Sequence, residues 1–255
     1  MVNNEVIFTN DDNVTISLID HHFSSLLEKR DNHEVLFRQI NTYLIKQNII
    51  KNNIIDLGAW IGDNSMPWAK NIKGIVYAID PSPENCQFIR DTCILNNINN
   101  VNVIQSAISN SNEILSTNDD LQHCSFEYDK LGTTGNIKVD AVSLDYLYET
   151  STIENIGYIH LDVEGMEYKV IEGSDKLINE CRPIISFEQH LNIDNYNAIL
   201  SILQNKNYKV FLIDEILPGC RIDCRNSLAF PNEIFNEALI QDIHTHIGQS
   251  ILIPK

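Results

Sequence analysis

The segment of residues 53–65, NIIDLGAWIGDNS, constrains the fold of this chain more than any other part. Its first residues form an apolar run typical of a buried strand, and a turn with Gly58 and Gly62 follows. A strand that passes through a glycine turn into a helix is the unit of α/β folds, and its turn lets a ligand approach the backbone closely. A cap for the following helix is expected from one of three residues, Asp63, Asn64 or Ser65.

A second strand is expected at 75–79, and it ends in Asp80, where an acidic residue can accept hydrogen bonds from ribose hydroxyls. The turn reads D-x-G-x-x-x-G, whereas the dinucleotide fingerprint is G-x-G-x-x-G. Trp60 in the turn leaves little room for a pyrophosphate, and S-adenosylmethionine has none. The carboxylate of Asp56 suits the positive charges of that molecule. The pattern therefore favours a methyltransferase over an NAD-dependent enzyme, and a plain strand–helix turn would not explain Asp56 and Asp80.

The rest of the chain alternates between strand and helix patterns, which predicts one α/β domain with a mostly parallel sheet covered by helices on both faces. Residues 1–50, with two short strands and a helix, are expected to pack on a core domain formed by residues 51–255. The polar segment 109–138 interrupts the alternation and is either a lid or a surface loop. Strands are expected at 53–57, 75–79, 101–104, 156–161, 183–188, 208–213 and 226–230, and helices at 64–71, 83–96, 143–149, 167–179 and 194–206.

A second group of polar residues follows the strand at 156–161. Alternation places His160, Asp162 and Glu164 on one side of the extended chain, facing the same crevice as Gly58 if the two strands are neighbours. Three interpretations are open: one carboxylate is a general base, the pair holds a divalent cation, or Glu164 caps the next helix. Glu167 is expected to be a solvated residue of the first helical turn.

The strand at 183–188 leads to Glu188 and His190, which are expected at the rim of the same crevice. His190 is either a second candidate for the base or a structural histidine.

Composition argues against several classes of partner. The net charge of −17 and the absence of a basic run argue against nucleic acid. No signal peptide or membrane-spanning stretch is evident, so a cytoplasmic protein without a membrane partner is expected. The spacing of Cys220 and Cys224, and of His244 and His246, fits no common zinc pattern, and no metal is expected. Reduced thiols are expected for all six cysteines, Cys86, Cys93, Cys124, Cys181, Cys220 and Cys224.

Taken together, these segments resemble the FkbM family of S-adenosylmethionine-dependent methyltransferases over roughly residues 50–230. The resemblance implies a Rossmann-like class I methyltransferase fold with a seven-stranded sheet and a final antiparallel strand. It also implies O-methylation of a hydroxyl on a sugar or another small molecule. The matching segments are IIDLGAWIGDNS at 54–65, YAIDPSPENCQFI at 77–89, VSLDYL at 142–147, IHLDVEGMEYKVIEG at 159–173 and RPIISFEQH at 182–190.

The resemblance also implies roles for individual positions. Asp80 would bind the ribose, Ser106 and Ala107 would lie near the adenine, and Asp162 would lie near the methionine end. Glu164, as first choice for the base, would face the acceptor together with Glu188 and His190. His160 stands where members usually carry lysine, and Asp80 where many carry glutamate. The cofactor loop and its surroundings would comprise Asp56, Gly58, Ala59, Trp60, Gly62, Asp63, Asn64 and Pro81.

Two alternatives to a small-molecule or carbohydrate methyltransferase are open. One is a catalytically inactive protein that binds S-adenosylmethionine and has a regulatory role, because a fold alone does not establish activity. The other is a methyltransferase that acts on a macromolecule.

Overall fold

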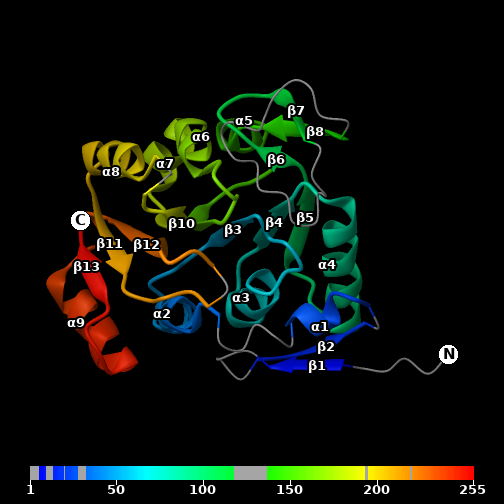
Figure 1. The fold of residues 1–255 in the computed structure, drawn as a ribbon, viewed down its shortest axis with the longest axis horizontal. Helices are drawn as coiled ribbons and strands as arrows, with labels where there is room; N and C mark the ends of the chain where they lie inside the picture. The colour runs from blue at the N-terminus through cyan, green and yellow to red at the C-terminus, as the bar shows by residue number, and fades with distance from the viewer. Residues whose placement is uncertain are drawn as a thin grey trace.

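The computed structural model describes residues 6–9, 14–19, 21–27, 33–117, 137–192, 195–218 and 220–255. Its centre is a sheet in the strand order β13-β11-β12-β10-β9-β3-β4-β5 (Figure 1). The strands are β3 (Asn53–Leu57), β4 (Val76–Asp80), β5 (Val101–Gln105), β9 (Ile156–Leu161), β10 (Ile184–His190), β11 (Tyr208–Ile213), β12 (Cys224–Pro231) and β13 (Leu252–Pro254).

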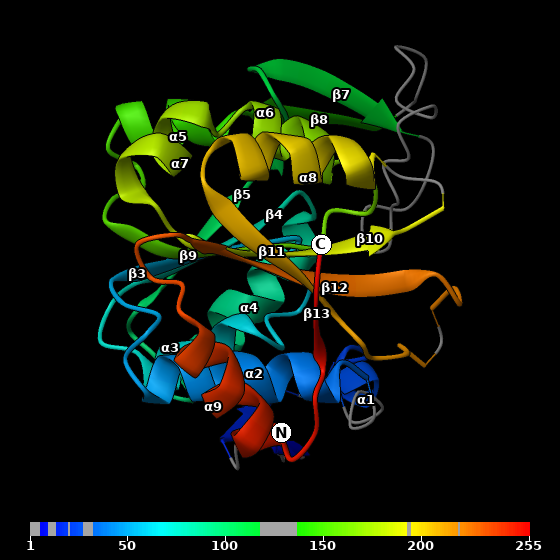
Figure 2. The same cartoon turned by 90° about the vertical axis from the view of Figure 1, so that its left-hand side faces the viewer.

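All seven predicted strands are present, but the prediction of a seven-stranded sheet is wrong by one strand. β13 adds an eighth strand, antiparallel to β11, at the edge of the sheet (Figure 2). β12 runs antiparallel to both β10 and β11, whereas β3, β4, β5, β9 and β10 are parallel to one another. The inner parallel strands β3, β4 and β9 are mostly apolar and almost entirely buried because helices cover both of their faces.

Helices lie on both faces of the sheet, as predicted (Figures 1 and 2). Each face has its own apolar core between sheet and helices. One core contains α2 (Val35–Lys46), α3 (Ser65–Asn71), α4 (Pro83–Leu95) and α9 (Glu237–Ile247), and the other contains α5 (Leu144–Glu149), α6 (Glu167–Glu172), α7 (Asp175–Cys181) and α8 (Tyr196–Asn205).

The single helix predicted over 167–179 is wrong, because the structure divides it into α6 and α7 at Gly173. A Cβ at this position would lie 2.5 Å from the carbonyl oxygen of Ser109, so only glycine allows the two segments to pass so closely.

The N-terminal part contains the predicted strands and helix. β1 (Val6–Thr9) and β2 (Thr15–Leu18) form an antiparallel hairpin, the short α1 (Ser24–Leu27) follows, and α2 packs against α3 and α9. The Glu215 carboxylate accepts hydrogen bonds from the backbone N–H groups of Leu36 (2.9 Å) and Phe37 (3.0 Å). This carboxylate satisfies free donors at the first turn of α2 and ties the helix to the segment that follows β11.

The ends of the predicted insertion 109–138 contribute to a small second sheet, formed by β6 (Ala107–Ile108), β7 (Glu113–Thr117) and β8 (Ile137–Val142). Residues 118–136, including Cys124, lie outside the described residues, so the choice between lid and loop stays a prediction. No helix in the described part of the chain is both long and apolar enough to cross a bilayer.

Candidate active site

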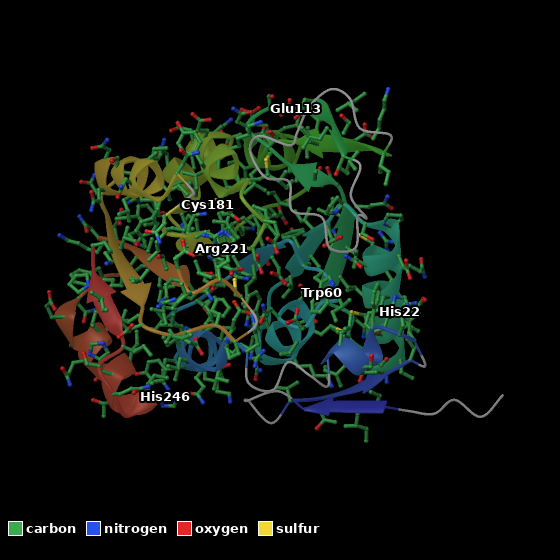
Figure 3. The ribbon with its side chains drawn as sticks, viewed as in Figure 1. His22, Trp60, Glu113, Cys181, Arg221 and His246 are labelled. Carbon is green, nitrogen blue, oxygen red and sulfur yellow. The ribbon has the colours of Figure 1, made fainter. Side chains whose placement is uncertain are left out.

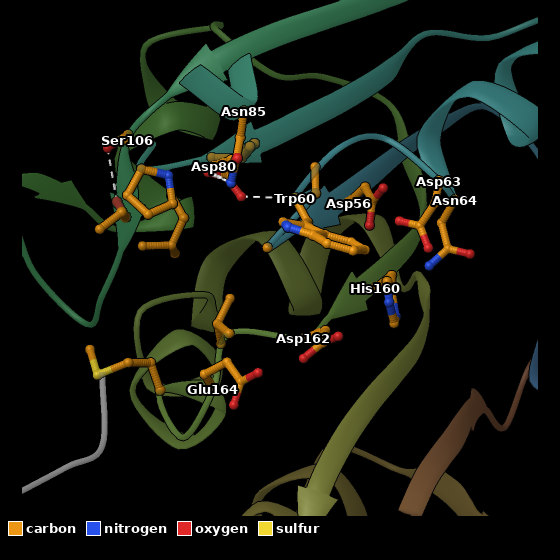
Figure 4. A pocket seen from close by; sticks show the side chains of 18 of the residues that line it. Asp56, Trp60, Asp63, Asn64, Asp80, Asn85, Ser106, His160, Asp162 and Glu164 are labelled. Atoms are coloured by element: carbon orange, nitrogen blue, oxygen red, sulfur yellow. Dashed lines mark hydrogen bonds between the residues drawn. The ribbon is translucent and has the colours of Figure 1, made fainter. Parts of the chain in front are cut away.

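A cavity of about 280 Å³ lies at the carboxyl ends of β3, β4 and β9 (Figure 4). In parallel α/β sheets this edge is where ligands bind. Ile108 and Leu115 reach the cavity from the small sheet. All predicted cofactor residues except Gly62 line it, namely Asp56, Gly58, Ala59, Trp60, Asp63, Asn64, Asp80, Pro81, Ser106, Ala107 and Asp162.

Gly58 is required by the neighbouring strand. Its φ is +74°, and a Cβ added there would lie 1.7 Å from the carbonyl oxygen of Asp162. The Asp162 N–H donates to the carbonyl of Leu57 at 3.0 Å, which continues the β3–β9 pairing to the edge of the cavity. The glycine therefore allows the ends of two strands to meet, which places Asp162 beside the turn.

Gly62 does not line the cavity, unlike the other predicted cofactor residues. A Cβ there would lie 3.1 Å from Ile89 on α4 and 3.3 Å from Met66 on α3. With φ at +77°, Gly62 allows the turn to pack tightly beneath α4.

Trp60 and Asp80 connect the two strand ends. Trp60 has a φ of +46°, which is uncommon for a bulky residue, and its N–H donates to Oδ2 of Asp80 at 2.9 Å. Oδ1 of Asp80 accepts from the Ser82 N–H (2.8 Å) and from Nδ2 of Asn85 (3.1 Å). Burial raises the pKa of Asp80 to about 7, although these three donors act in the opposite direction.

Two further buried oxygens line the cavity without a hydrogen-bond partner among the described residues: Oδ1 of Asn85 and Oδ1 of Asn64.

Asn64 precedes α3 but its side chain makes no capping bond, and the Ser65 hydroxyl donates to Asp56 instead. The sequence predicted that Asp63, Asn64 or Ser65 caps α3, and for Asn64 and Ser65 this prediction is wrong. Burial raises the pKa of Asp56 to about 7, and the nearby Asp63 carboxylate acts in the same direction.

The β9 end of the cavity carries His160, Asp162 and Glu164, as the alternation predicted. His160 is buried and its Nδ1 lies 2.9 Å from the hydroxyl of Ser186. Its ring packs against that of Phe37 at a tilt of 35°, with centroids 4.9 Å apart. The histidine is thus held rigidly in the wall of the cavity.

Asp162 and Glu164 differ in exposure. Asp162 is half-buried and its carboxyl group hydrogen-bonds to Glu188. Burial raises the pKa of Asp162 to about 6, and the negative charge of Glu164 adds to this rise. Glu164 is exposed to the cavity and has a φ of +52°, a strained conformation that is concentrated at functional sites.

Glu167 holds the turn that presents Glu164. It is buried, and its Oε1 accepts from the N–H groups of Val163 (3.0 Å) and Gly165 (3.3 Å). Its Oε2 accepts from Nε2 of Gln189 at 2.9 Å. The prediction of a solvated residue is therefore wrong. Glu167, rather than Glu164, accepts the hydrogen bonds of the Val163 and Gly165 amides at this turn.

Glu188 and His190 do not line the main cavity. They line a smaller hollow that adjoins it, together with Asp162 and Glu164. Several lining residues were not predicted from the sequence: Ile79, Asn85, Ile108, Leu115, Val163 and Met166. A signal existed only for Asn85, whose N–H bonds to the Ser82 side chain as an N-cap partner.

The matches to known proteins agree with this geometry. A model of the methyltransferase FkbM domain matches residues 56–210. The chain belongs to this family. No curated protein matches the sequence.

A solved methyltransferase structure shares the fold of this FkbM family member. An O-methyltransferase from Bacillus cereus, solved in complex with SAH, aligns with a TM-score of 0.50 at 12% identity, over 76% of this chain and 80% of that one. The methyltransferase FkbM from Methylobacillus flagellatus aligns with a TM-score of 0.49 at 18% identity. That match covers 70% of this chain but only 43% of the Methylobacillus chain.

Proposed function

We propose that this protein transfers a methyl group from S-adenosylmethionine to a hydroxyl group of a small molecule or carbohydrate. Membership of the family supports methyl transfer. The choice of S-adenosylmethionine as the methyl donor rests on the hydrogen bonds around the Asp80 carboxylate. A carboxylate offers about four acceptor sites, and three fixed donors occupy sites on Asp80. Because Asp80 lines the cavity, a ribose hydroxyl bound there would donate to the remaining site.

The donors and acceptors of the cavity fit S-adenosylmethionine. Buried oxygens without a partner are costly, so Asn64 and Asn85 point to a ligand that donates hydrogen bonds. Asp56 and Asp63 supply negative charge that would attract the sulfonium and ammonium groups. Ser106, Ala107 and Ile108 would contact the adenine.

The methyl donor supplies an electrophilic methyl group on a sulfonium, which is already a good leaving group. The main task of the protein is therefore to align the acceptor oxygen with that methyl group. Glu164, exposed in the strained turn after β9, would take the proton of the acceptor hydroxyl, which makes the oxygen a better nucleophile. His190 stays a second candidate for this role.

The negative charge of the cavity limits which acceptors are expected to bind. Among its lining residues in the described structure there is no Lys or Arg, whereas carboxylates come from three strand ends. A phosphorylated acceptor or nucleic acid would be repelled, since binding of polyanions depends on basic side chains. This favours a neutral or cationic small molecule or carbohydrate.

Calorimetric titration with S-adenosylmethionine tests the assignment. We expect binding by the wild type and by Asp242→Asn, a control on the exposed face of α9. Asp80→Ala should bind at least tenfold more weakly because charge-assisted hydrogen bonds are lost. No binding by the wild type would overturn the proposal.

Turnover with a panel of sugar and small-molecule hydroxyl acceptors tests the base. Glu164→Gln should lose a factor of about 10²–10⁴ in turnover, as is typical of a general base, with unchanged affinity for S-adenosylmethionine. Normal turnover of this variant would exclude Glu164. Binding without transfer to any acceptor by the wild type would instead support a catalytically inactive binding protein.

A further inference from the structure

Four side chains that ligate metals in other proteins meet beside the cavity: Glu188, His190, Cys220 and Cys224. Each offers one ligand atom, and these atoms all lie within 4.8 Å of one another. The sequence spacing concealed this group because it combines two residues of β10 with a pair of cysteines from a distant part of the chain. His244 and His246, the other half of the sequence pattern, are engaged elsewhere.

Strand geometry brings the four together. Glu188 and His190 are two residues apart on β10 and so share one face of the sheet. In the antiparallel β10–β12 pair, His190 lies directly opposite Cys224. Cys220 approaches from the segment before β12, where its backbone N–H bonds to the carbonyl of Leu217.

Two of the distances between ligand atoms match those of a tetrahedral zinc site. With usual Zn–S, Zn–N and Zn–O bond lengths, ligand atoms at the corners of a tetrahedron lie about 3.3–3.8 Å apart. Sγ of Cys220 lies 3.5 Å from Oε1 of Glu188 and 3.7 Å from Nε2 of His190. Sγ of Cys224 is in direct contact with Oε1 of Glu188, so a small rotation of the glutamate would be needed to admit an ion.

We propose that these four side chains bind one Zn²⁺ ion per chain. Two sulfurs, an imidazole nitrogen and a carboxylate oxygen are the ligand types that zinc prefers. On binding, each cysteine thiol releases its proton to the solvent and coordinates as a thiolate. Four protein ligands leave no open position, which is typical of a structural rather than a catalytic zinc ion.

The ion would act on the active site by fixing its rim. It would pin the segment that links β11 to β12 to the end of β10, and that segment also carries Glu215 at the first turn of α2. The carboxyl group of Glu188 contacts Asp162, which lines the main cavity. Zinc would therefore make Glu188 and His190 positioning residues and leave Glu164 as the base.

Metal analysis of the purified, reduced protein tests the site with Zn²⁺ alone. After equilibration and removal of excess metal, we expect one zinc per wild-type chain and a matching endpoint in competition with a chromophoric chelator. The Cys220→Ser/Cys224→Ser double variant should lose this zinc. Binding of Co²⁺ in place of Zn²⁺ should give the strong visible absorption of a tetrahedral site with thiolate ligands.

Two matched controls keep the test specific. Cys181→Ser removes a thiol outside the cluster, and His22→Ala removes a ligand from the other group of potential ligands in the described structure, His21, His22 and Glu84. His22 lies well apart from Arg221, which stands between the two clustered cysteines in the chain (Figure 3). Both controls should keep one zinc.

The proposal is overturned if the wild type holds no stoichiometric zinc, if the double variant retains it, or if His22→Ala abolishes it. Should the double variant fail to fold by circular dichroism, His190→Gln and the Co²⁺ spectrum of the wild type decide the question. Because no assay here contains S-adenosylmethionine, a negative result leaves the proposed methyl transfer standing and returns His190 to the role of second candidate base.

Discussion

The backbone N–H of Trp60 donates a 2.9 Å hydrogen bond to the Asp80 carboxylate, which joins the turn after β3 to the end of β4. This bond couples the two segments from which the methyl donor is proposed to be recognised. It also links the protonation state of Asp80 to the conformation of the turn, since a carboxylate accepts this bond better than a neutral acid.

Affinity for S-adenosylmethionine should increase with pH through neutrality. Burial raises the pKa of Asp80 to about 7, so the acceptor form is a minority at pH 6 and dominant at pH 8. Binding that requires the ionised form is weakened in proportion to its population, about tenfold at pH 6. Calorimetric titration with S-adenosylmethionine between pH 6 and pH 8 measures this change in affinity. Asp56, with its pKa also raised to about 7, acts in the same direction, so Asp80→Asn should reduce the pH dependence but not abolish it. An unchanged pH dependence in Asp80→Asn would exclude this role of Asp80.

Gly58→Ala should destabilise the fold strongly, because its Cβ would overlap the Asp162 carbonyl at 1.7 Å. We expect a loss of about 3 kcal/mol or more in the free energy of unfolding, from steric overlap added to strain at positive φ. Gly248→Ala is the matched control. Its φ is +83° but nothing lies within 4 Å of the added Cβ, so it should cost only about 1 kcal/mol. Equal losses in urea denaturation would show that close approach of the strands is not the cause.

Glu167→Ala should lower stability by about 2–3 kcal/mol, because it leaves the amides of Val163 and Gly165 without their acceptor. Glu167→Gln keeps an acceptor oxygen, and rotation of the Gln189 amide restores the remaining bond, so this variant should be near wild type. Thermal unfolding distinguishes the two. If both variants lose stability equally, the negative charge of Glu167, rather than its shape, holds the turn.

Tyr158→Phe should cost about 1–2 kcal/mol, since the buried hydroxyl donates to Oδ1 of Asn41 and also bonds to Ser186, 2.6 Å away. Tyr208→Phe provides the comparison: that hydroxyl is buried without a hydrogen-bond partner in the described structure, so its removal should be neutral or stabilising. The order of the two melting temperatures is the readout, and the reverse order would contradict the hydrogen-bond assignment.

Local sequence patterns were sufficient to predict those elements whose pattern lies within a single segment of the chain. The seven strands could be predicted because each is an apolar run bounded by polar or glycine residues. The carboxyl ends of β3, β4 and β9 could be predicted as one site because parallel strands end at the same edge. α9 and β13 were missed, although Asn236 caps α9 through a bond from the Leu239 N–H.

Contacts between distant segments could not be predicted. The burial of Glu167, the packing of Gly62 under α4 and the arrival of Leu115 in the cavity all depend on how separate elements pack, which no local spacing records. Glu167 reads as a surface residue in sequence because only the folded chain places Gln189 and two free amides around it.

The sequence by itself determined the α/β class, the family and the position of the turn that is proposed to bind the methyl donor, because these depend on periodicity and on motifs within single strand–helix units. The tertiary structure alone decided which side chains share a site at the rim. The register of β10 against β12 sets His190 opposite Cys224, and a shift of that register by one residue would turn the cysteine to the other face of the sheet.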